Sequence, residues 1–242
     1  MTQSEKKHIK QLQQKKYRNL YGSFVVEGLK SIRDFLAAGY IPEKIYSTVP
    51  FEQMKNQDLP VEIISEKNLR QISFLKNPKD ALAIIKIPKS LSLPQSGWII
   101  ALDNLQDPGN LGTIIRTADW FGIKNIVCSL DTVDCYNPKV VQATMGSLAN
   151  VSVFYTDLSN FLSKSRLPIF GACMQGKNIY QSLFPHQGIL VVGNEGNGIS
   201  NHIKGLITNK ITIPKHQKST ADSLNAAIAT TIFVSKIMRE IN

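Results

Sequence analysis

The chain has 242 residues, with 28 Lys or Arg against 18 Asp or Glu, which gives a formal net charge of +10 at pH 7. Its 43% of hydrophobic and 19% of charged residues exclude a wholly disordered or low-complexity chain, and no uncharged stretch is apolar enough to predict a transmembrane helix. Three cysteines without C-x-x-C spacing disfavour a disulfide framework and a zinc site, so we expect no bound metal.

The N-terminal segment is strongly basic. It carries the cations Lys6, Lys7, Lys10, Lys15, Lys16 and Arg18. Such a segment is compatible with a nucleic-acid contact surface or with a solvent-exposed helix face, and the net charge favours a polyanionic partner. Because it has neither a large apolar face nor an apolar stretch like that of a signal peptide, we expect no membrane attachment and a cytoplasmic location.

Residues 23–87 are predicted to alternate short strands with helices. One helix face consists of Leu29, Ile32, Phe35 and Leu36. This helix is expected to stop at Gly39, and a second helix is expected to begin near Glu66. The remaining apolar runs, ending with 81–87, indicate four strands. Four short strands with their helices form a compact α/β unit.

The composition changes after residue 87. The segment 88–97, PKSLSLPQSG, contains two prolines, a glycine and three serines, which is typical of a linker between domains. We therefore predict two domains, 1–95 and 96–242.

The second half contains apolar runs that indicate strands. They are WIIALD (98–103), NIVCSL (125–130), PIFGACM (168–174), GILVVGN (188–194) and ITIP (211–214). Segments of helical character separate them, including 111–121 and the final 223–240. Apolar strands alternating with helices predict a largely parallel sheet with both faces covered. In such sheets ligands bind in the loops that follow the carboxyl ends of the strands.

Three of these loops carry polar and glycine residues. The first, DNLQDPGNLG (103–112), contains a Pro-Gly-Asn turn and leads into a helix with Arg116. The second, GNEGNGIS (193–200), has its glycines in the order G-x-x-G-x-G, which excludes the dinucleotide fingerprint. The third precedes the last helix, where Asp222 or Ser223 could simply serve as the N-cap. Each loop taken alone also has a purely structural explanation, as a turn, as a helix that carries a surface arginine, or as a helix cap.

The segment GACMQGKN (171–178) resembles part of a phosphate-binding loop. It fits a phosphate-loop pattern up to Lys177, but Asn178 stands where a Ser or Thr would hold magnesium. No strong helix is predicted after it, so the sequence disfavours an NTPase.

Taken together, the three loops resemble the motifs of the SpoU (TrmH) family of RNA ribose 2′-O-methyltransferases, within the SPOUT class. Residues 110–118, NLGTIIRTA, resemble the first motif, N-x-G-x-x-x-R-x-A, and residues 193–198 resemble the second. Ile213-Pro214 with Ser223-Leu224-Asn225 resembles the third. The resemblance covers residues 97–242 strongly. More weakly, FVVEG (24–28) and the preceding basic segment resemble the family's RNA substrate-binding domain.

The resemblance implies an α/β protein with a C-terminal SPOUT domain, which has a parallel sheet and a trefoil knot that binds S-adenosylmethionine, and with a small N-terminal L30e-like α/β domain. It also implies RNA as the partner and a homodimer with active sites at the interface. The implied catalytic positions are Arg116, Asn110, Glu195, Ser223 and Asn225. The implied cofactor-binding positions are Gly193, Ile213 and Leu224. No metal is required.

Arg116 is expected to orient the substrate and stabilise the developing alkoxide, because a guanidinium with a pKa above ~12 is a poor base. The segment 215–222 departs from the shorter family pattern, so the cofactor loop could differ in shape. The retained polar positions favour an active enzyme that methylates a ribose 2′-hydroxyl in rRNA. The alternatives are a tRNA ribose 2′-O-methyltransferase and a non-catalytic RNA-binding or ribosome-assembly protein of the same fold.

Overall fold

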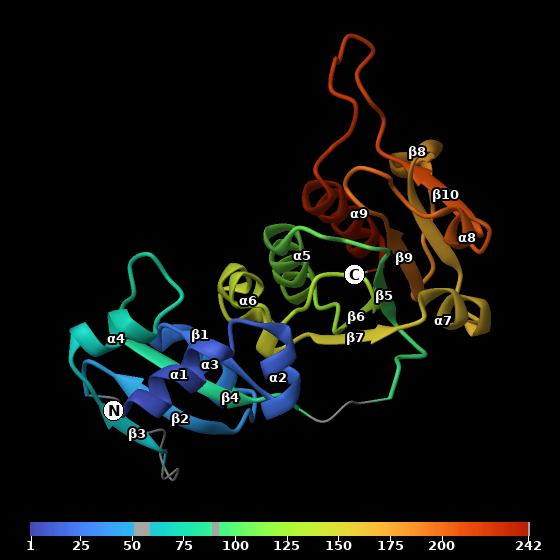
Figure 1. Cartoon of the computed structure of the whole chain (residues 1–242). Coiled ribbons are helices and arrows are strands. Elements are labelled where there is room, and N and C mark those ends of the chain that lie inside the picture. The colour runs from blue at the N-terminus through green and yellow to red at the C-terminus, as the bar shows by residue number, and fades with distance from the viewer. Residues whose placement is uncertain (51–58, 89–91, 242) are drawn as a thin grey trace. The chain divides into compact units, whose positions relative to one another are not determined.

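The structure is a computed structural model that describes residues 1–50, 59–88 and 92–241 (Figure 1). The chain divides into two compact units: Met1–Lys89 with Asp134–Ala149, and Ser90–Val133 with Asn150–Asn242. Part of the predicted linker, 89–91, lies outside the described residues. No helix among the residues that the structure describes is long and apolar enough to cross a membrane.

The first unit is built on a four-stranded sheet in the order β1-β4-β2-β3. The strands are β1 (Ser23–Glu27), β2 (Pro42–Ser47), β3 (Val61–Ile63) and β4 (Ala81–Lys86). β4 is antiparallel to β1 and β2, and β2 is parallel to β3. The helices are α1 (Gln3–Gln11), α2 (Lys15–Tyr21), α3 (Leu29–Ala37), α4 (Glu66–Ile72) and α6 (Pro138–Thr144), with a 3₁₀ turn, η1 (Ser147–Ala149). The predicted four-stranded α/β unit is confirmed.

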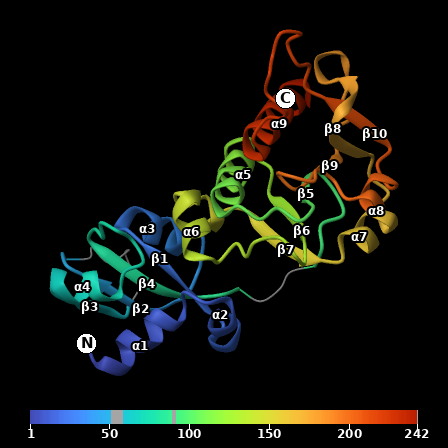
Figure 2. The same cartoon turned by 45° about the horizontal axis from the view of Figure 1, so that its top comes forward.

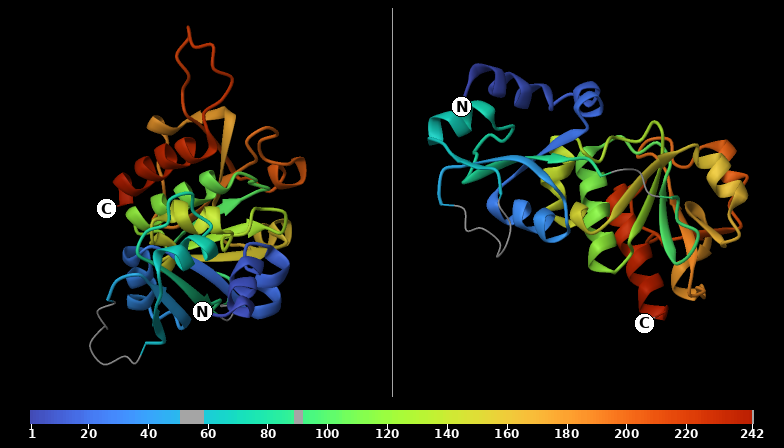
Figure 3. Two further views of the ribbon diagram at one scale, coloured as in Figure 1. Left: turned by 60° about the vertical axis from the view of Figure 1, so that its left-hand side comes forward. Right: turned by 90° about the horizontal axis from the view of Figure 1, so that it is seen from below.

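Alternation along β1 explains how helices cover both faces of this sheet. Val25 points into a core with Ile9 of α1 and Leu69 of α4. Phe24 points to the other face, where its ring lies 5.5 Å from that of Phe35 in α3. Figures 2 and 3 show α1 and α3 on opposite sides of the sheet.

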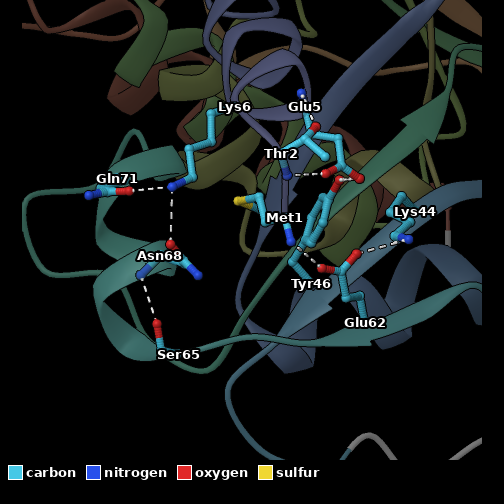
Figure 4. Close-up of polar contacts among 10 residues, drawn as sticks. All are labelled: Met1, Thr2, Glu5, Lys6, Lys44, Tyr46, Glu62, Ser65, Asn68 and Gln71. Atoms are coloured by element: carbon cyan, nitrogen blue, oxygen red, sulfur yellow. Dashed lines mark hydrogen bonds and ion pairs between the residues drawn. The ribbon is translucent and has the colours of Figure 1, made fainter.

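Several basic side chains of the N-terminal segment form hydrogen bonds within the first unit. Arg18 is only 2% exposed; its Nε donates to Asp134 Oδ2 at 3.0 Å, and its Nη1 donates to the carbonyl oxygens of Leu12 and Gln13. The expectation that Arg18 adds to a basic surface is therefore wrong, because Asp134 compensates its charge in the interior. Lys6 donates to two side chains of α4 (Figure 4).

The second unit contains a six-stranded, fully parallel sheet in the order β10-β8-β9-β5-β6-β7. The strands are β5 (Trp98–Leu102), β6 (Asn125–Ser129), β7 (Ser152–Thr156), β8 (Ile169–Asn178), β9 (Gly188–Val192) and β10 (Asn209–Thr212). The helices are α5 (Pro108–Trp120), α7 (Leu158–Lys164), α8 (Asn201–Lys204) and α9 (Ala226–Ile241), with a 3₁₀ turn, η2 (Ile179–Gln181). Figures 1 and 3 show α5 and α9 side by side on one face, with α7 and α8 on the other. The predicted parallel sheet with two covered faces is confirmed.

The strand β8 includes the segment that imitates a phosphate loop. Both its glycines pack closely: a Cβ at Gly171 would overlap the side chain of Ile207, and one at Gly176 would lie 2.6 Å from the carbonyl oxygen of Lys210. The glycines thus allow β8 to approach its neighbours, and the segment is a strand, not a loop that could surround a phosphate.

Candidate active site

The first two candidate loops are joined by hydrogen bonds at the carboxyl ends of β5 and β9. Asn194 Nδ2 donates to the carbonyl oxygen of Asn104 at 2.8 Å. The buried Asp103 accepts from the backbone N–H of Ser200 at 2.7 Å. Both contacts join residues adjacent to neighbouring parallel strands, where ligand sites of such sheets are expected.

A line of side chains joins all three loops. Asn225 Nδ2 donates to Asn110 Oδ1 at 2.8 Å, and Asn110 Nδ2 donates to Glu195 Oε1 at 3.0 Å. Asn110 is 8% exposed. We call these three side chains the polar relay. It brings together three residues, one from each motif, that the sequence singled out.

The carboxylate of Glu195 ends the polar relay. Desolvation raises the pKa of this group, but hydrogen bonds from Asn110 and from backbone N–H groups lower the pKa more, so it lies below the ordinary value of 4.5. Glu195 is therefore ionised at neutral pH, with acceptor positions taken by Asn110 and by the backbone N–H of Asp107 at 3.3 Å.

Asn225 also begins the last helix. Its Oδ1 accepts from the backbone N–H groups of Ala227 at 2.9 Å and Ile228 at 3.2 Å. This is the geometry of an N-cap, so the alternative that Ser223 or Asp222 caps this helix is wrong. One side chain thus both caps α9 and joins the polar relay.

A cavity of about 810 Å³ lies beside the relay. It is lined by part of β8 and by the second and third loops, and its lining includes Gly193, Glu195, Ile213, Ser223 and Leu224. Asn110, Asn225 and Arg116 are not part of the lining. The loop between β10 and α9 projects away from the sheet (Figure 1).

The cavity lining fits an adenosyl cofactor. Apolar groups from Val192, Ile199 and Phe233 offer a surface for a flat base. The lining carries both signs of charge, from the carboxylates of Glu195 and Asp222 and from three lysines, 204, 210 and 215, and this suits a ligand with an amino group and a carboxylate. The cavity also lies within the size range typical of small-molecule sites, roughly 300–1,000 Å³.

Two of the three glycines of the second loop, Gly193 and Gly198, are required by the conformation of the loop itself. A Cβ at Gly193 would overlap the backbone of Gly198 and Ile199. Gly198 has φ +67°, and it exchanges two backbone hydrogen bonds with Asn194. The close approach at Gly193 and these two hydrogen bonds restrict the conformations that the loop can adopt.

Arg116 lies apart from the polar relay. It is exposed on α5, and no hydrogen bond or ion pair reaches its side chain from residues 1–50, 59–88 or 92–241. Trp120, one turn further along α5, is 84% exposed. The structure thus brings together Asn110, Glu195 and Asn225, places Ser223 at the cavity, and leaves Arg116 on an open helix face.

The sequence interpretation missed two residues that organise the loops. Asp107 caps α5 by accepting from the backbone N–H of Asn110 at 2.7 Å, and Asn194 Oδ1 accepts from the backbone N–H groups of Gly196 and Asn197. The Asp-Pro pair at 107–108 is a recognisable helix-start signal. Within the described ranges, no three His, Cys, Asp or Glu side chains are grouped to hold a metal ion.

Two family models match this chain. The family model described as SpoU rRNA Methylase family matches residues 97–235, and the one described as MRM3-like substrate binding domain matches residues 4–83. The chain is 28% identical over 236 residues to the 23S rRNA (guanosine(2553)-2′-O)-methyltransferase RlmP of Bacillus subtilis, with 94% of this chain and 93% of that protein covered.

Two solved structures are similar along nearly the whole chain. One is a candidate RNA methyltransferase of the TrmH family from Porphyromonas gingivalis, with a TM-score of 0.91, 34% identity and coverage of 99% of this chain and 98% of that one. The other is an AdoMet-bound rRNA methyltransferase from Sinorhizobium meliloti, with a TM-score of 0.87, 28% identity and coverage of 100% and 97%.

Proposed function

The chain belongs to the SpoU rRNA Methylase family, and we propose from this that it transfers a methyl group from S-adenosylmethionine to a ribose 2′-hydroxyl of ribosomal RNA. The observation that carries the proposal is the polar relay, because it joins the three motif loops beside a cavity of cofactor size. Relatives named as 23S rRNA 2′-O-methyltransferases in Bacillus subtilis and Streptomyces viridochromogenes support rRNA over tRNA.

The cavity residues would hold the cofactor. Gly193, Ile213 and Leu224 would bind it, largely through backbone groups, and Glu195 would fix the neighbouring loops through Asn110. When bound, S-adenosylmethionine would supply the methyl group: its sulfur–methyl bond would break as the ribose 2′-oxygen bonds to the methyl carbon, S-adenosylhomocysteine would leave and the hydroxyl proton would pass to water. Positioning these two partners in line accounts for much of such a reaction's acceleration.

Arg116 would act on the substrate. A guanidinium carries N–H donors and a permanent positive charge, so it can orient the 2′-hydroxyl and stabilise the developing alkoxide. Ser223 offers a hydroxyl at the cavity to the same substrate. We assign the catalytic role to these two side chains and a positioning role to Asn110, Glu195 and Asn225.

We propose a homodimer, which would explain the place of Arg116. Trp120 on α5 is 84% exposed and Ile228 on the adjacent α9 is 53% exposed, and the two helices are joined by a hydrogen bond between Thr117 and Thr231 at 2.9 Å. A second copy covering this face would bury both apolar side chains and bring its Arg116 near a site other than that of its own chain.

Residues 1–95 are proposed to bind the RNA substrate, which the match of 4–83 to a substrate binding domain supports, and residues 96–242 are proposed to form the SPOUT catalytic domain. The trefoil knot stays a prediction; the meeting of the loops after β9 and β10 at one cavity supports it. We also propose a cytoplasmic location, which the similarity to the bacterial relative from Bacillus subtilis supports.

The test is transfer of labelled methyl from S-adenosylmethionine to total rRNA and, separately, to total tRNA, each from a strain that lacks this gene. We expect label in rRNA, mapped to a 2′-O-methyl ribose. Label in tRNA alone would assign the other RNA class, and no label in either pool, with RNA binding retained, would support the non-catalytic alternative.

The roles of individual residues need variants. Arg116→Ala should abolish transfer with nearly unchanged cofactor affinity, whereas Arg166→Ala, which removes another exposed arginine of the second unit, should remain active. If the sites are shared between copies, mixing inactive Arg116→Ala with Gly193→Ala, which should not bind the cofactor, should restore up to about a quarter of the activity, because half the dimers are mixed and each has one intact site. No restoration would contradict the shared site.

A further inference from the structure

Three aromatic side chains gather on the surface of α1 and α2. The rings of His8 and Tyr21 lie 4.6 Å apart at an interplanar angle of 62°, and those of Tyr17 and Tyr21 lie 6.0 Å apart at 12°. Tyr21 is 40% exposed, and the neighbouring Leu20 is 70% exposed. We call His8, Tyr17 and Tyr21 the aromatic platform. Its rings are not used by the cofactor cavity, whose lining comes from the second unit.

The platform is held rigidly. The hydroxyl of Tyr21 donates to Gln11 Oε1 at 3.1 Å, which joins α2 to α1. The hydroxyl of Ser23 donates to the carbonyl oxygen of Tyr21 at 3.1 Å, and Gly22, with φ +64°, ends α2 immediately after the ring. The buried Arg18 fixes the turn between the two helices through the carbonyl groups of 12 and 13. A platform ordered before binding loses little conformational entropy when a ligand arrives.

The surroundings of the platform are cationic. Lys16 Nζ lies 4.7 Å from the centroid of the Tyr17 ring, and Lys7, which precedes His8 in α1, is exposed. Lys6 and Lys10 are occupied by contacts with the segment 68–73. The carboxylate of Glu5, the nearest acid in sequence, accepts from the backbone N–H of Thr2 and from the hydroxyl of Tyr46. His8 and Tyr17 are half-buried and Tyr21 is exposed, so each ring keeps part of its surface open. Positive charge next to aromatic rings that solvent can reach is the combination that binds single-stranded nucleic acids.

We propose that the aromatic platform stacks on unpaired nucleotides of the RNA substrate while Lys16 and Lys7 contact the adjoining phosphates. The inference rests on the proposed function for its substrate class, and it narrows that class to RNA with an unpaired segment. A-form duplexes are recognised mostly by shape and backbone contacts, whereas splayed bases stack on Tyr and His rings. A partner protein with an acidic surface would need the lysines but not the ring faces.

The experiment compares RNA binding of the full chain with that of two double variants. The probe is a fluorescently labelled single-stranded oligoadenylate. Binding to a fully paired RNA duplex of equal length is measured for comparison. Tyr17→Ala with Tyr21→Ala should weaken binding to the single strand by about tenfold or more, since each stacked base contributes substantially, and should leave duplex binding within about twofold. Tyr17→Phe with Tyr21→Phe keeps both rings and should bind as the unchanged chain does.

Two controls separate stacking from charge and from folding. Tyr180→Ala removes an exposed tyrosine of the second unit and should bind unchanged. Lys16→Gln should lower the dependence of binding on salt, whereas loss of the rings should not, because stacking releases no counterions. Unchanged thermal unfolding of the alanine variant shows that its loss of binding is not a loss of fold.

The proposal would be overturned if the alanine variant bound the single strand with an affinity within about twofold of that of the unchanged chain. An equal loss of affinity for the duplex would also overturn the proposal, because the effect would then belong to charge or to a protein-binding surface. Methyl transfer is measured separately with rRNA. If the chain methylates rRNA but its RNA binding does not depend on the tyrosine rings, only the role of the aromatic platform is refuted. If RNA binding depends on the rings but no methyl group is transferred, only the proposed function is refuted.

Discussion

Replacing Asn110 by alanine is the sharpest test of the polar relay. The substitution removes the donor to Glu195 Oε1 at 3.0 Å and the acceptor of Asn225 Nδ2 at 2.8 Å. It leaves the backbone N–H of residue 110 bound to Asp107, so α5 keeps its cap. The expected loss therefore reports on the links between loops and not on the start of the helix.

The magnitude follows from the two lost hydrogen bonds. A bond to a charged group contributes about 1.5–3 kcal/mol and a neutral one about 0.5–1.5 kcal/mol. Asn110 is buried, but Glu195 is exposed and regains water when its partner is removed, so the lower halves of these ranges apply. The sum is about 2–3 kcal/mol, which lowers the melting temperature of a domain of this size by about 4–12 °C.

Differential scanning calorimetry measures this shift, and titration calorimetry measures S-adenosylmethionine affinity, which should fall by about tenfold or more as the loops loosen. Asn150→Ala is the matched control, because it removes a longer bond of 3.5 Å between an exposed asparagine amide and the carboxylate of Asp119. It should change the melting temperature by less than about 2 °C. Equal shifts for the two variants, with cofactor affinity intact, would refute a structural role for the relay.

Three further substitutions test separate parts of the molecule. Gly193→Ala should abolish cofactor binding in calorimetry, because its Cβ would overlap the backbone of Gly198 and force the loop to move. Arg18→Ala should destabilise the first unit by about 3–5 kcal/mol in thermal unfolding, because Asp134 is left without its cation. Burial raises the pKa of the Glu27 carboxyl above 4.5, so its stabilising contribution is complete below about pH 4.5 and is lost as the pH rises through the raised value. Glu27→Gln should remove that part of the pH dependence from unfolding curves, and identical curves would contradict it.

The strands of the second unit were predictable where they are buried on both faces. β5 and β9 are buried at every residue, so they appear in the sequence as continuous apolar runs. β7 was missed because it is an edge strand in which only Phe154 is buried and its neighbours are partly exposed. Its Ser, Tyr and Thr residues therefore lack the apolar pattern that identifies the other strands.

The location of the site could be predicted from the sequence, but the hydrogen bonds that build it could not. The expected carboxyl-end loops of the parallel strands do meet, because that follows from topology. The hydrogen bonds of the relay join residues 85 and 115 positions apart, and no local pattern encodes such a pairing. The basic segment illustrates the same limit: Arg18 cannot be distinguished from its exposed neighbours until Asp134, 116 positions away, is brought beside it.

The relay also restricts which group can take the proton of the 2′-hydroxyl. Glu195 has a lowered pKa and accepts hydrogen bonds from Asn110 and from backbone N–H groups, so it is a weak base at neutral pH. A guanidinium is weaker still, because it is already protonated. The relay is therefore best understood as a scaffold that fixes the cofactor loops. Stabilisation of the alkoxide would then have to come from a cation outside the relay, which is the role proposed for Arg116 and is compatible with its separation from Asn110 and Glu195.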